Sequence, residues 1–146
     1  TNAEQGWVEA SCLKFMPTLY PLVADLAVVC ARGCSDLPVP ALWKRMAFEQ
    51  EVFRFFGPGH EGRQNVVSVG DSMYEVQALQ GIAAGAANRV GKSVKLMSSP
   101  SVDQMIAQHE LLREQLPDVV AHHGALDLGF DLDASDGFGD DDDTDG

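Results

Sequence analysis

The sequence predicts an α/β protein built on a parallel sheet, and two observations carry that prediction. The first is a valine-rich run over residues 65–69, which ends in Gly70 and Asp71 and is followed by an apolar helical pattern. The second is the alternation of such runs with helical stretches along most of the chain. A buried strand that carries a carboxylate at its C-terminal end is typical of open α/β sheets, whose ligands bind at that edge.

The first half of the chain predicts two helices and one strand. Residues 3–15 place apolar side chains at helical spacing and end before Pro17, which favours a helix. The apolar run over 26–31 predicts a buried strand. Residues 41–56 predict a second helix, whose inward stripe consists of Leu42, Met46, Phe53 and Phe56.

The second half predicts two further pairs of a strand and a helix. The strand over 65–69 leads into a helix over 72–84, and a strand over 93–97 leads into a final helix. Ser101 and Gln104 have the spacing of a capping box at the start of that helix. One face of this helix consists of Val102, Met105, Ile106, His109 and Leu112.

Length and charge predict one domain with an acidic tail. A chain of 146 residues with 45% hydrophobic content suits a single domain. Of its 22 acidic residues, nine are aspartates in the segment 127–146, which has no basic residue. We therefore expect an α/β domain over 1–126 and a disordered acidic tail over 127–146. This charge argues against nucleic acid and anionic membranes as partners, and it suits a basic protein partner for the tail.

Cysteine usage and hydropathy indicate the compartment. Cys12, Cys30 and Cys34 form no Cys-x-x-Cys pair, which favours reduced thiols and a cytoplasmic location. No apolar run approaches the roughly 18 residues of a membrane-spanning helix.

The segment from Gly70 to Glu75 allows two interpretations. Glu75 lies one helical turn beyond Asp71, so both carboxylates can face one pocket, and oxygen ligands at a strand end suit Mg²⁺. Alternatively, Asp71 simply caps the following helix, and Ser72 to Glu75 also fit a capping box, in which case no metal is needed. These residues alone leave both interpretations open.

The segment Gly70–Glu75, with its Gly-Asp-Ser-x-x-Glu pattern, resembles the fourth motif of the haloacid dehalogenase-like (HAD) superfamily of phosphohydrolases. Lys44 stands in the place of the family's third motif, a lysine on an upstream helix. Thr1 stands in the place of the second motif, a serine or threonine at a strand end. The run Lys92–Leu96 is similar to the family's last strand, so the resemblance covers roughly residues 1–116.

The resemblance implies a fold, a reaction and roles for four residues. The fold would be a HAD-like, Rossmann-like three-layer α/β/α domain around a parallel sheet. The reaction would be the Mg²⁺-dependent hydrolysis of a phosphorylated substrate. Thr1 and Lys44 would bind the phosphoryl oxygens as catalytic residues, while Asp71 and Glu75 would hold the metal.

One part of the family pattern is missing. HAD enzymes attack phosphate with the first aspartate of an Asp-x-Asp motif at the end of their first strand, and nothing precedes Thr1 here. The Asp131-Leu132-Asp133 sequence lies in the acidic tail and follows no strand pattern. We therefore expect the C-terminal part of a phosphatase, lacking the first two strands and inactive by itself. The alternative is a non-catalytic HAD-like binding module whose tail recruits a basic partner.

Overall fold

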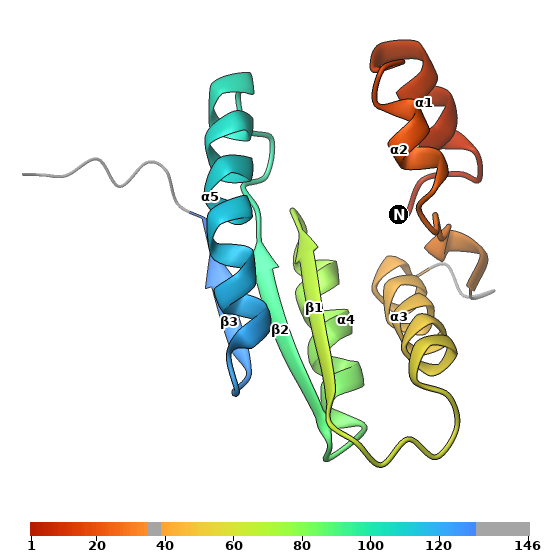
Figure 1. Cartoon of the computed structure of the whole chain (residues 1–146). Coiled ribbons are helices and arrows are strands. Elements are labelled where there is room, and N and C mark those ends of the chain that lie inside the picture. Colours follow the sequence, from red (N-terminus) through yellow and green to blue (C-terminus); the bar gives the residue numbers. More distant parts are fainter. Residues whose placement is uncertain (35–38, 131–146) are drawn as a thin grey trace, which may run out of the picture.

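A computed structural model describes residues 1–34 and 39–130 and has a mixed α/β fold (Figure 1). Three parallel strands form one sheet in the order β1-β2-β3, and they are β1 (Gln64–Gly70), β2 (Arg89–Lys95) and β3 (Leu126–Gly129). The register aligns Gly70 with Lys95 and Lys95 with Gly129. The C-terminal ends of all three strands therefore meet at one edge of the sheet.

Helices lie on both faces of the sheet (Figure 1). Helix α3 (Pro40–Phe56) packs on α4 (Met73–Ala84), which in turn packs on β1 and β2. Helix α5 (Val102–Ala121) lies on the other face, where Lys92 Nζ donates a hydrogen bond to the Val120 carbonyl at 2.8 Å. Gly91, the residue before Lys92 in β2, faces Leu79 of α4 on the opposite side of the sheet. Adjacent strand residues point to opposite faces, so the two helices cover opposite sides.

The hydrophobic core lies between α3, α4 and β1. Val52, Leu79 and Ile82 are buried at its centre, and partly buried side chains of Phe48, Phe56 and Val66 pack against them. Since this core joins the helix that carries Lys44 to the strand that ends at Gly70, it positions the candidate site.

Most of the predicted elements between residues 40 and 121 are confirmed. The helices over 41–56 and 72–84 and the strand over 65–69 are present as α3, α4 and β1. The strand predicted over 93–97 is present as β2 but begins and ends earlier. The predicted capping box is also present: Ser101 Oγ accepts from the Gln104 amide at 3.2 Å, and Gln104 Oε1 accepts from the Ser101 amide at 2.9 Å.

The apolar face predicted for α5 is largely exposed. Val102 is 72% exposed, and Met105 and Ile106 are also exposed. The buried residues of this helix are Gln108 and Val119. Gln108 Oε1 accepts a hydrogen bond from the Met97 amide at 3.0 Å, so an amide side chain is buried in order to satisfy the loop after β2. In α3 the predicted stripe is likewise only partly inward, because Met46 and Phe53 are exposed.

The strand predicted over 26–31 is also wrong. Helices α1 (Trp7–Phe15) and α2 (Tyr20–Ala24) are followed by an irregular stretch and a 3₁₀ turn, η1 (Ala31–Cys34). Leu26 is 66% exposed. Among the described residues, Thr1 is the one residue distant in sequence whose backbone bonds this stretch: its nitrogen donates to the Val29 carbonyl at 3.0 Å, and its carbonyl accepts from the Ala31 amide at 2.8 Å. One backbone neighbour does not make a strand.

The predicted start of the acidic tail, residue 127, lies too early in the sequence, because this residue belongs to a strand. Residues 126–129 form β3 and pair with residues 92–95 of β2. Asp127 takes part through its side chain, because its Oδ1 accepts a hydrogen bond from Ser93 Oγ. The predicted tail from residue 131 onward lies outside the described residues.

Two further sequence expectations concern cysteines and membranes. Cys12, Cys30 and Cys34 are all free thiols, as expected. Within the described ranges, no helix is long and apolar enough to cross a membrane.

Candidate functional site

The candidate site lies where β1 ends and α4 begins. Ser72 caps α4, because its Oγ accepts a hydrogen bond from the Tyr74 amide at 3.0 Å. Ser72, rather than Asp71, is therefore the N-cap of α4, and its Oγ accepts from Tyr74 instead of Glu75, the partner that a capping box requires. Glu75 follows in the first turn of α4, where the helix dipole favours a negative charge.

Lys44 and Glu75 form an ion pair that joins α3 to α4. Lys44 Nζ lies 2.6 Å from Glu75 Oε1, and the two side chains are only 12% and 13% exposed. The attraction is stronger here than on the surface because little water screens it, but the cost of removing both charges from water is also larger. The pair therefore serves mainly to hold both side chains in place.

Glu75 is ionised at neutral pH. Burial opposes its ionisation, but the hydrogen bond and the positive charge of Lys44 outweigh burial, so the pKa of Glu75 lies below its ordinary value of 4.5. Its second oxygen, Oε2, is buried and has no hydrogen-bond partner among the described residues. A buried carboxylate oxygen without a partner is suited to a cation or to a donor group of a ligand.

Gly70 leaves room for Glu75 to fold back over the end of β1. A Cβ at position 70 would lie 2.6 Å from Glu75 Cγ and 3.0 Å from Cδ. These atoms hold the carboxylate against Lys44, so the side chain cannot move aside without disturbing the ion pair. A glycine is therefore required here by close approach.

Thr1 lies beside Lys44 at the same cavity. Both residues line a space of about 240 Å³ between α3 and β1. Thr1 Oγ1 accepts a hydrogen bond from the Ala3 amide at 3.0 Å. A hydroxyl that accepts in this way still has its own proton to donate to a ligand. The structure thus brings together three of the four predicted residues, Thr1, Lys44 and Glu75.

Asp71, the fourth predicted residue, is exposed at the end of β1. Its backbone carbonyl accepts from Ser98 Oγ at 2.8 Å, which ties the loop after β1 to the loop after β2. Across residues 1–34 and 39–130, no group of three or more His, Cys, Asp or Glu side chains could hold a metal ion. Mg²⁺ commonly uses only one or two protein carboxylates. The metal-binding role of Asp71 and Glu75 stays a prediction.

Sequence analysis gave no functional role to Lys95 or Ser98, which also belong to this edge. Lys95 aligns with Gly70 in the sheet, and its Nζ donates to Ser98 Oγ at 3.3 Å. It therefore places a positive charge beside the loop that carries Asp71. The neighbouring Ser99 has a φ of 56°, which is uncommon for a residue other than glycine. The parallel alignment of the two strand ends was the signal that could have identified Lys95.

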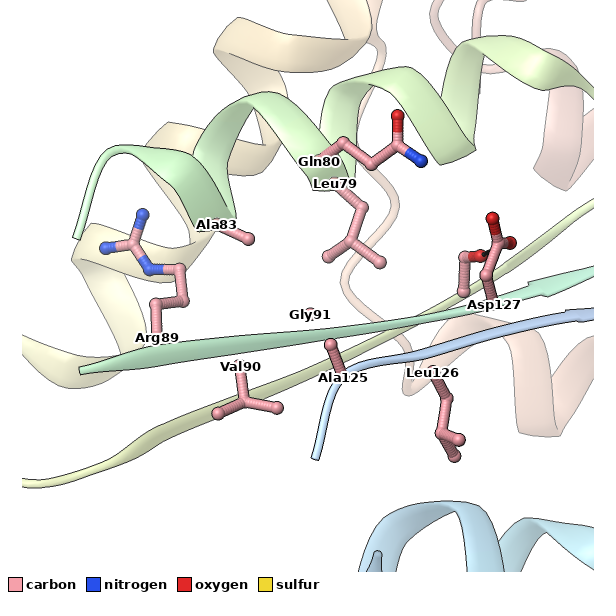
Figure 2. Close-up of a pocket in the computed structure, with 10 residues that line it drawn as sticks. Leu79, Gln80, Ala83, Arg89, Val90, Gly91, Ala125, Leu126 and Asp127 are labelled. Atoms are coloured by element: carbon pink, nitrogen blue, oxygen red, sulfur yellow. Dashed lines mark hydrogen bonds between the residues drawn. The ribbon is translucent and has the colours of Figure 1, made fainter. Parts of the chain in front are cut away.

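A second cavity lies away from this site, between α4 and the start of β2 (Figure 2). It encloses about 420 Å³, and Leu79 and Ala83 point into it from α4. Most of its polar side chains are already engaged: Arg89 donates to Gln64 Oε1 and to the Ile82 carbonyl, and Asp127 accepts from Ser93. We assign no chemistry to it, because its remaining lining is largely apolar.

Neither protein-family models, curated proteins nor solved structures gave a match to this chain. The resemblance to the HAD superfamily therefore rests on the residues quoted above and is a proposal.

Proposed function

We propose that this chain carries the phosphate-binding and metal-binding residues of a Mg²⁺-dependent HAD-like phosphatase. The observation that best supports the proposal is the meeting of Thr1, Lys44 and Glu75, from three separate segments, near the C-terminal end of β1. Ligands of open α/β sheets bind at this edge.

The proposal gives Lys44 and Thr1 the task of binding phosphoryl oxygens. The ammonium group of Lys44 supplies a positive charge, and the Thr1 hydroxyl donates a hydrogen bond. Glu75 positions Lys44 through Oε1. Lys95 adds a second positive charge at the neighbouring strand end.

Asp71 and Glu75 would hold Mg²⁺ in this proposal. The exposed carboxylate of Asp71 and the unpartnered Oε2 of Glu75 are oxygen ligands of the kind that this ion prefers. Bound Mg²⁺ would neutralise charge on the phosphoryl oxygens. Because Lys44 already neutralises part of the charge on Glu75, we expect Asp71 to contribute more to metal binding.

The covalent step requires a nucleophile that the resemblance assigns to an aspartate outside this sequence. That carboxylate would attack phosphorus, form an aspartyl-phosphate and displace the alcohol of the substrate. We therefore expect the chain by itself to bind phosphate without hydrolysing phosphate esters. Turnover of an aryl phosphate that disappears in Asp71→Ala would contradict this expectation.

The binding test is an NMR titration of the full chain with MgCl₂ and inorganic phosphate. We expect the amides of Gly70, Asp71 and Ser72 to shift before others, with Mg²⁺ affinity in the millimolar range, or about 4 kcal/mol. Asp71→Asn should abolish the Mg²⁺ shift, and Lys44→Met should abolish the phosphate shift.

Two matched variants control for general charge effects. Asp103→Asn removes another acidic group from the first turn of a helix, and Lys14→Met removes a lysine from α1. Both should leave the shifts unchanged, and acidic residues elsewhere in the chain remain the same in every variant. If the three amides stay still in a folded sample, Ser72 and its neighbours only cap the helix, and the proposal fails.

A second candidate is a non-catalytic binding module, favoured by the concentration of nine aspartates without a basic residue over 127–146. Such a segment would attract a basic protein by charge. Since residues 126–129 belong to β3, the deletion that tests this should remove only 131–146. It should abolish binding of a lysine-rich peptide and leave the circular dichroism unchanged. Retained binding would count against this candidate.

A further inference from the structure

Helix α5 carries a regular line of exposed side chains. The side chains that this helix buries, Gln108 and Val119, lie on another face. The exposed line advances by four, three, four, three and four residues, and it consists of Val102, Ile106, His109, Arg113, Leu116 and Val120. All four of its apolar members are exposed. Single exposed apolar residues are common, but a regular line along one helix indicates an interaction surface. We call these six residues the α5 stripe.

The spacing of the α5 stripe is that of a helix that pairs with a second helix. Steps that alternate between three and four residues average 3.5, the repeat that keeps one seam facing a partner helix. The stripe runs the full length of α5, 20 residues or about 30 Å, and the helix continues through Pro117. Beside its middle is a shallow hollow of about 520 Å³, lined by Met105, Ile106, His109, Glu110 and Arg113. Such a hollow can receive a side chain of the facing helix.

The α5 stripe is also symmetric in sequence about Leu111. Its six members form three pairs whose two residues are equally far from Leu111: Val102 with Val120, Ile106 with Leu116, and His109 with Arg113. A two-fold axis that relates α5 to an antiparallel second copy brings each residue opposite the one equally far on the other side. Such a pair of α5 helices places valine against valine at both ends and isoleucine against leucine further in. No apolar member of the stripe then faces a charged one.

Charged residues at the middle of α5 complement each other in the same arrangement. Glu110 and Arg113 are exposed, and among the described residues neither forms an ion pair. In the antiparallel pair, His109 lies opposite the partner's Arg113. Glu110 is the next residue after His109, so its carboxylate lies beside the partner's Arg113 guanidinium. The two-fold axis produces this ion pair twice, and opposite charges that meet only between two copies favour a second copy as the partner.

We propose that the α5 stripe binds the α5 stripe of a second copy of this chain, as an antiparallel helix pair whose two-fold axis passes at the level of Leu111. The apolar ends exclude water, and the charged centre fixes the register. The segment 131–146 cannot supply a matching stripe, because Leu132 and Phe138 are its only large apolar residues. A helix of any other sequence would leave the symmetry about Leu111 without a cause. The stripe contains no residue of the candidate functional site, so the pair forms whether or not the chain binds phosphate.

Sedimentation equilibrium of the full chain tests whether the pair forms. With rising concentration the mass should approach about 31 kDa, twice the 15.7 kDa of one chain. Ile106→Gln places an amide in the seam and should weaken association at least tenfold. Leu111→Gln is the matched control, since Leu111 is exposed on the opposite side of the helix, and it should change little. Circular dichroism checks that both variants fold. A mass of one chain at about 1 mM, or equal losses in both variants, would overturn the proposal.

Charge exchange tests the centre of the pair. Glu110→Arg and Arg113→Glu each bring like charges together in the pair and should weaken association of that variant at least tenfold. Mixed in equal amounts, the two variants complement each other and should associate about as tightly as the unaltered chain. Glu114→Arg, an equal charge change outside the stripe, should have little effect. If each single variant associates normally, or if the mixture stays monomeric, the central ion pairs do not form and the proposal is wrong.

The direction of the two helices is measured by NMR on a mixture of isotope-labelled and unlabelled chains. Isotope-filtered nuclear Overhauser effects report only contacts between different copies. We expect methyl contacts from Val102 to the partner's Val120 and from Ile106 to the partner's Leu116. Contacts of Val102 with the partner's Val102 would show a parallel pair and would overturn the antiparallel arrangement. A dimer without contacts between α5 helices would show that the copies associate through another surface, and the proposal would fail.

Discussion

Residues 64–129 and residues 1–34 are both rich in apolar side chains, but the first region buries more of the large ones. Between 64 and 129, every strand has a parallel neighbour, and Leu79, Ile82 and Val94 are almost completely buried. In residues 1–34, Phe15 is 70% exposed and Leu22 is 67% exposed. Both regions contain runs that predict buried elements, so hydrophobicity by itself does not explain the difference.

The difference lies in the partners that each region has. Strands and helices alternate over 64–129, so each new strand pairs with the preceding one and each helix covers a face. Within residues 1–34 and 39–130, the long-range backbone hydrogen bonds of the run over 26–31 are those to Thr1. An apolar segment becomes a buried strand only where another backbone satisfies its amides and carbonyls.

The largest expected effect tests where the core lies. Leu79→Ala removes a fully buried side chain from the core and should cost about 2–5 kcal/mol of unfolding free energy. Leu22→Ala, the matched change in residues 1–34, should cost less than about 0.5 kcal/mol, since that side chain is exposed. Urea denaturation followed by circular dichroism measures both. Similar losses would mean that the two regions do not differ as described.

A smaller effect is expected from Gly70→Ala. The added Cβ would collide with Glu75 and should cost about 1–3 kcal/mol in unfolding free energy. Gly33→Ala, where nothing lies within 4 Å of the added atom, should be close to neutral. Combining Gly70→Ala with Glu75→Ala should recover part of the loss, because the colliding side chain is then gone. A fully additive double variant would contradict the collision.

The ion pair predicts how stability depends on pH. Since the pKa of Glu75 is lower in the folded chain than its ordinary value of 4.5, its contribution is present above pH 4.5 and is lost as pH falls through the folded pKa. Glu75→Gln should flatten this part of the stability curve, whereas Glu49→Gln, in an exposed pair with Arg45, should not. If stability falls at acid pH in Glu75→Gln as steeply as in the unaltered chain, the ion pair does not make this contribution.

The smallest effect concerns Lys92 on the opposite face. Its side chain is fully buried, and burial, with a smaller contribution from the charge of Arg63, lowers its pKa. Protonation of Lys92 is therefore less favourable in the folded chain than in the unfolded chain. The resulting loss of folding stability is greatest below the folded pKa and is relieved as pH rises toward 10.5. Lys92→Met should be neutral or stabilising by up to about 1 kcal/mol at pH 7.

The Val120 carbonyl should tolerate this change, because Asn65 Nδ2 also donates to it at 3.0 Å. Thermal unfolding at pH 7 measures the effect. A marked loss of stability in Lys92→Met, repeated in Lys92→Leu, would indicate that the lysine hydrogen bond outweighs the burial of its charge.

Sequence by itself determined the elements whose interactions are local. The strand that ends at Gly70, the cap at Ser72 and the capping box at Ser101 depend on residues a few positions apart, and all three are present. For the candidate site, the resemblance to the HAD superfamily selected Thr1, Lys44 and Glu75, which do come together. It was not enough to show that Glu75 is paired with Lys44.

Tertiary structure decided everything that depends on a distant partner. Packing of α3 on α4 creates the ion pair, and the alignment of strand ends brings Lys95 beside Asp71. Pairing with β2 draws residues 126–129 into the sheet, although their sequence reads as the start of an acidic tail. Backbone hydrogen bonds between strands join residues far apart in sequence, so no local pattern encodes whether a partner will be present.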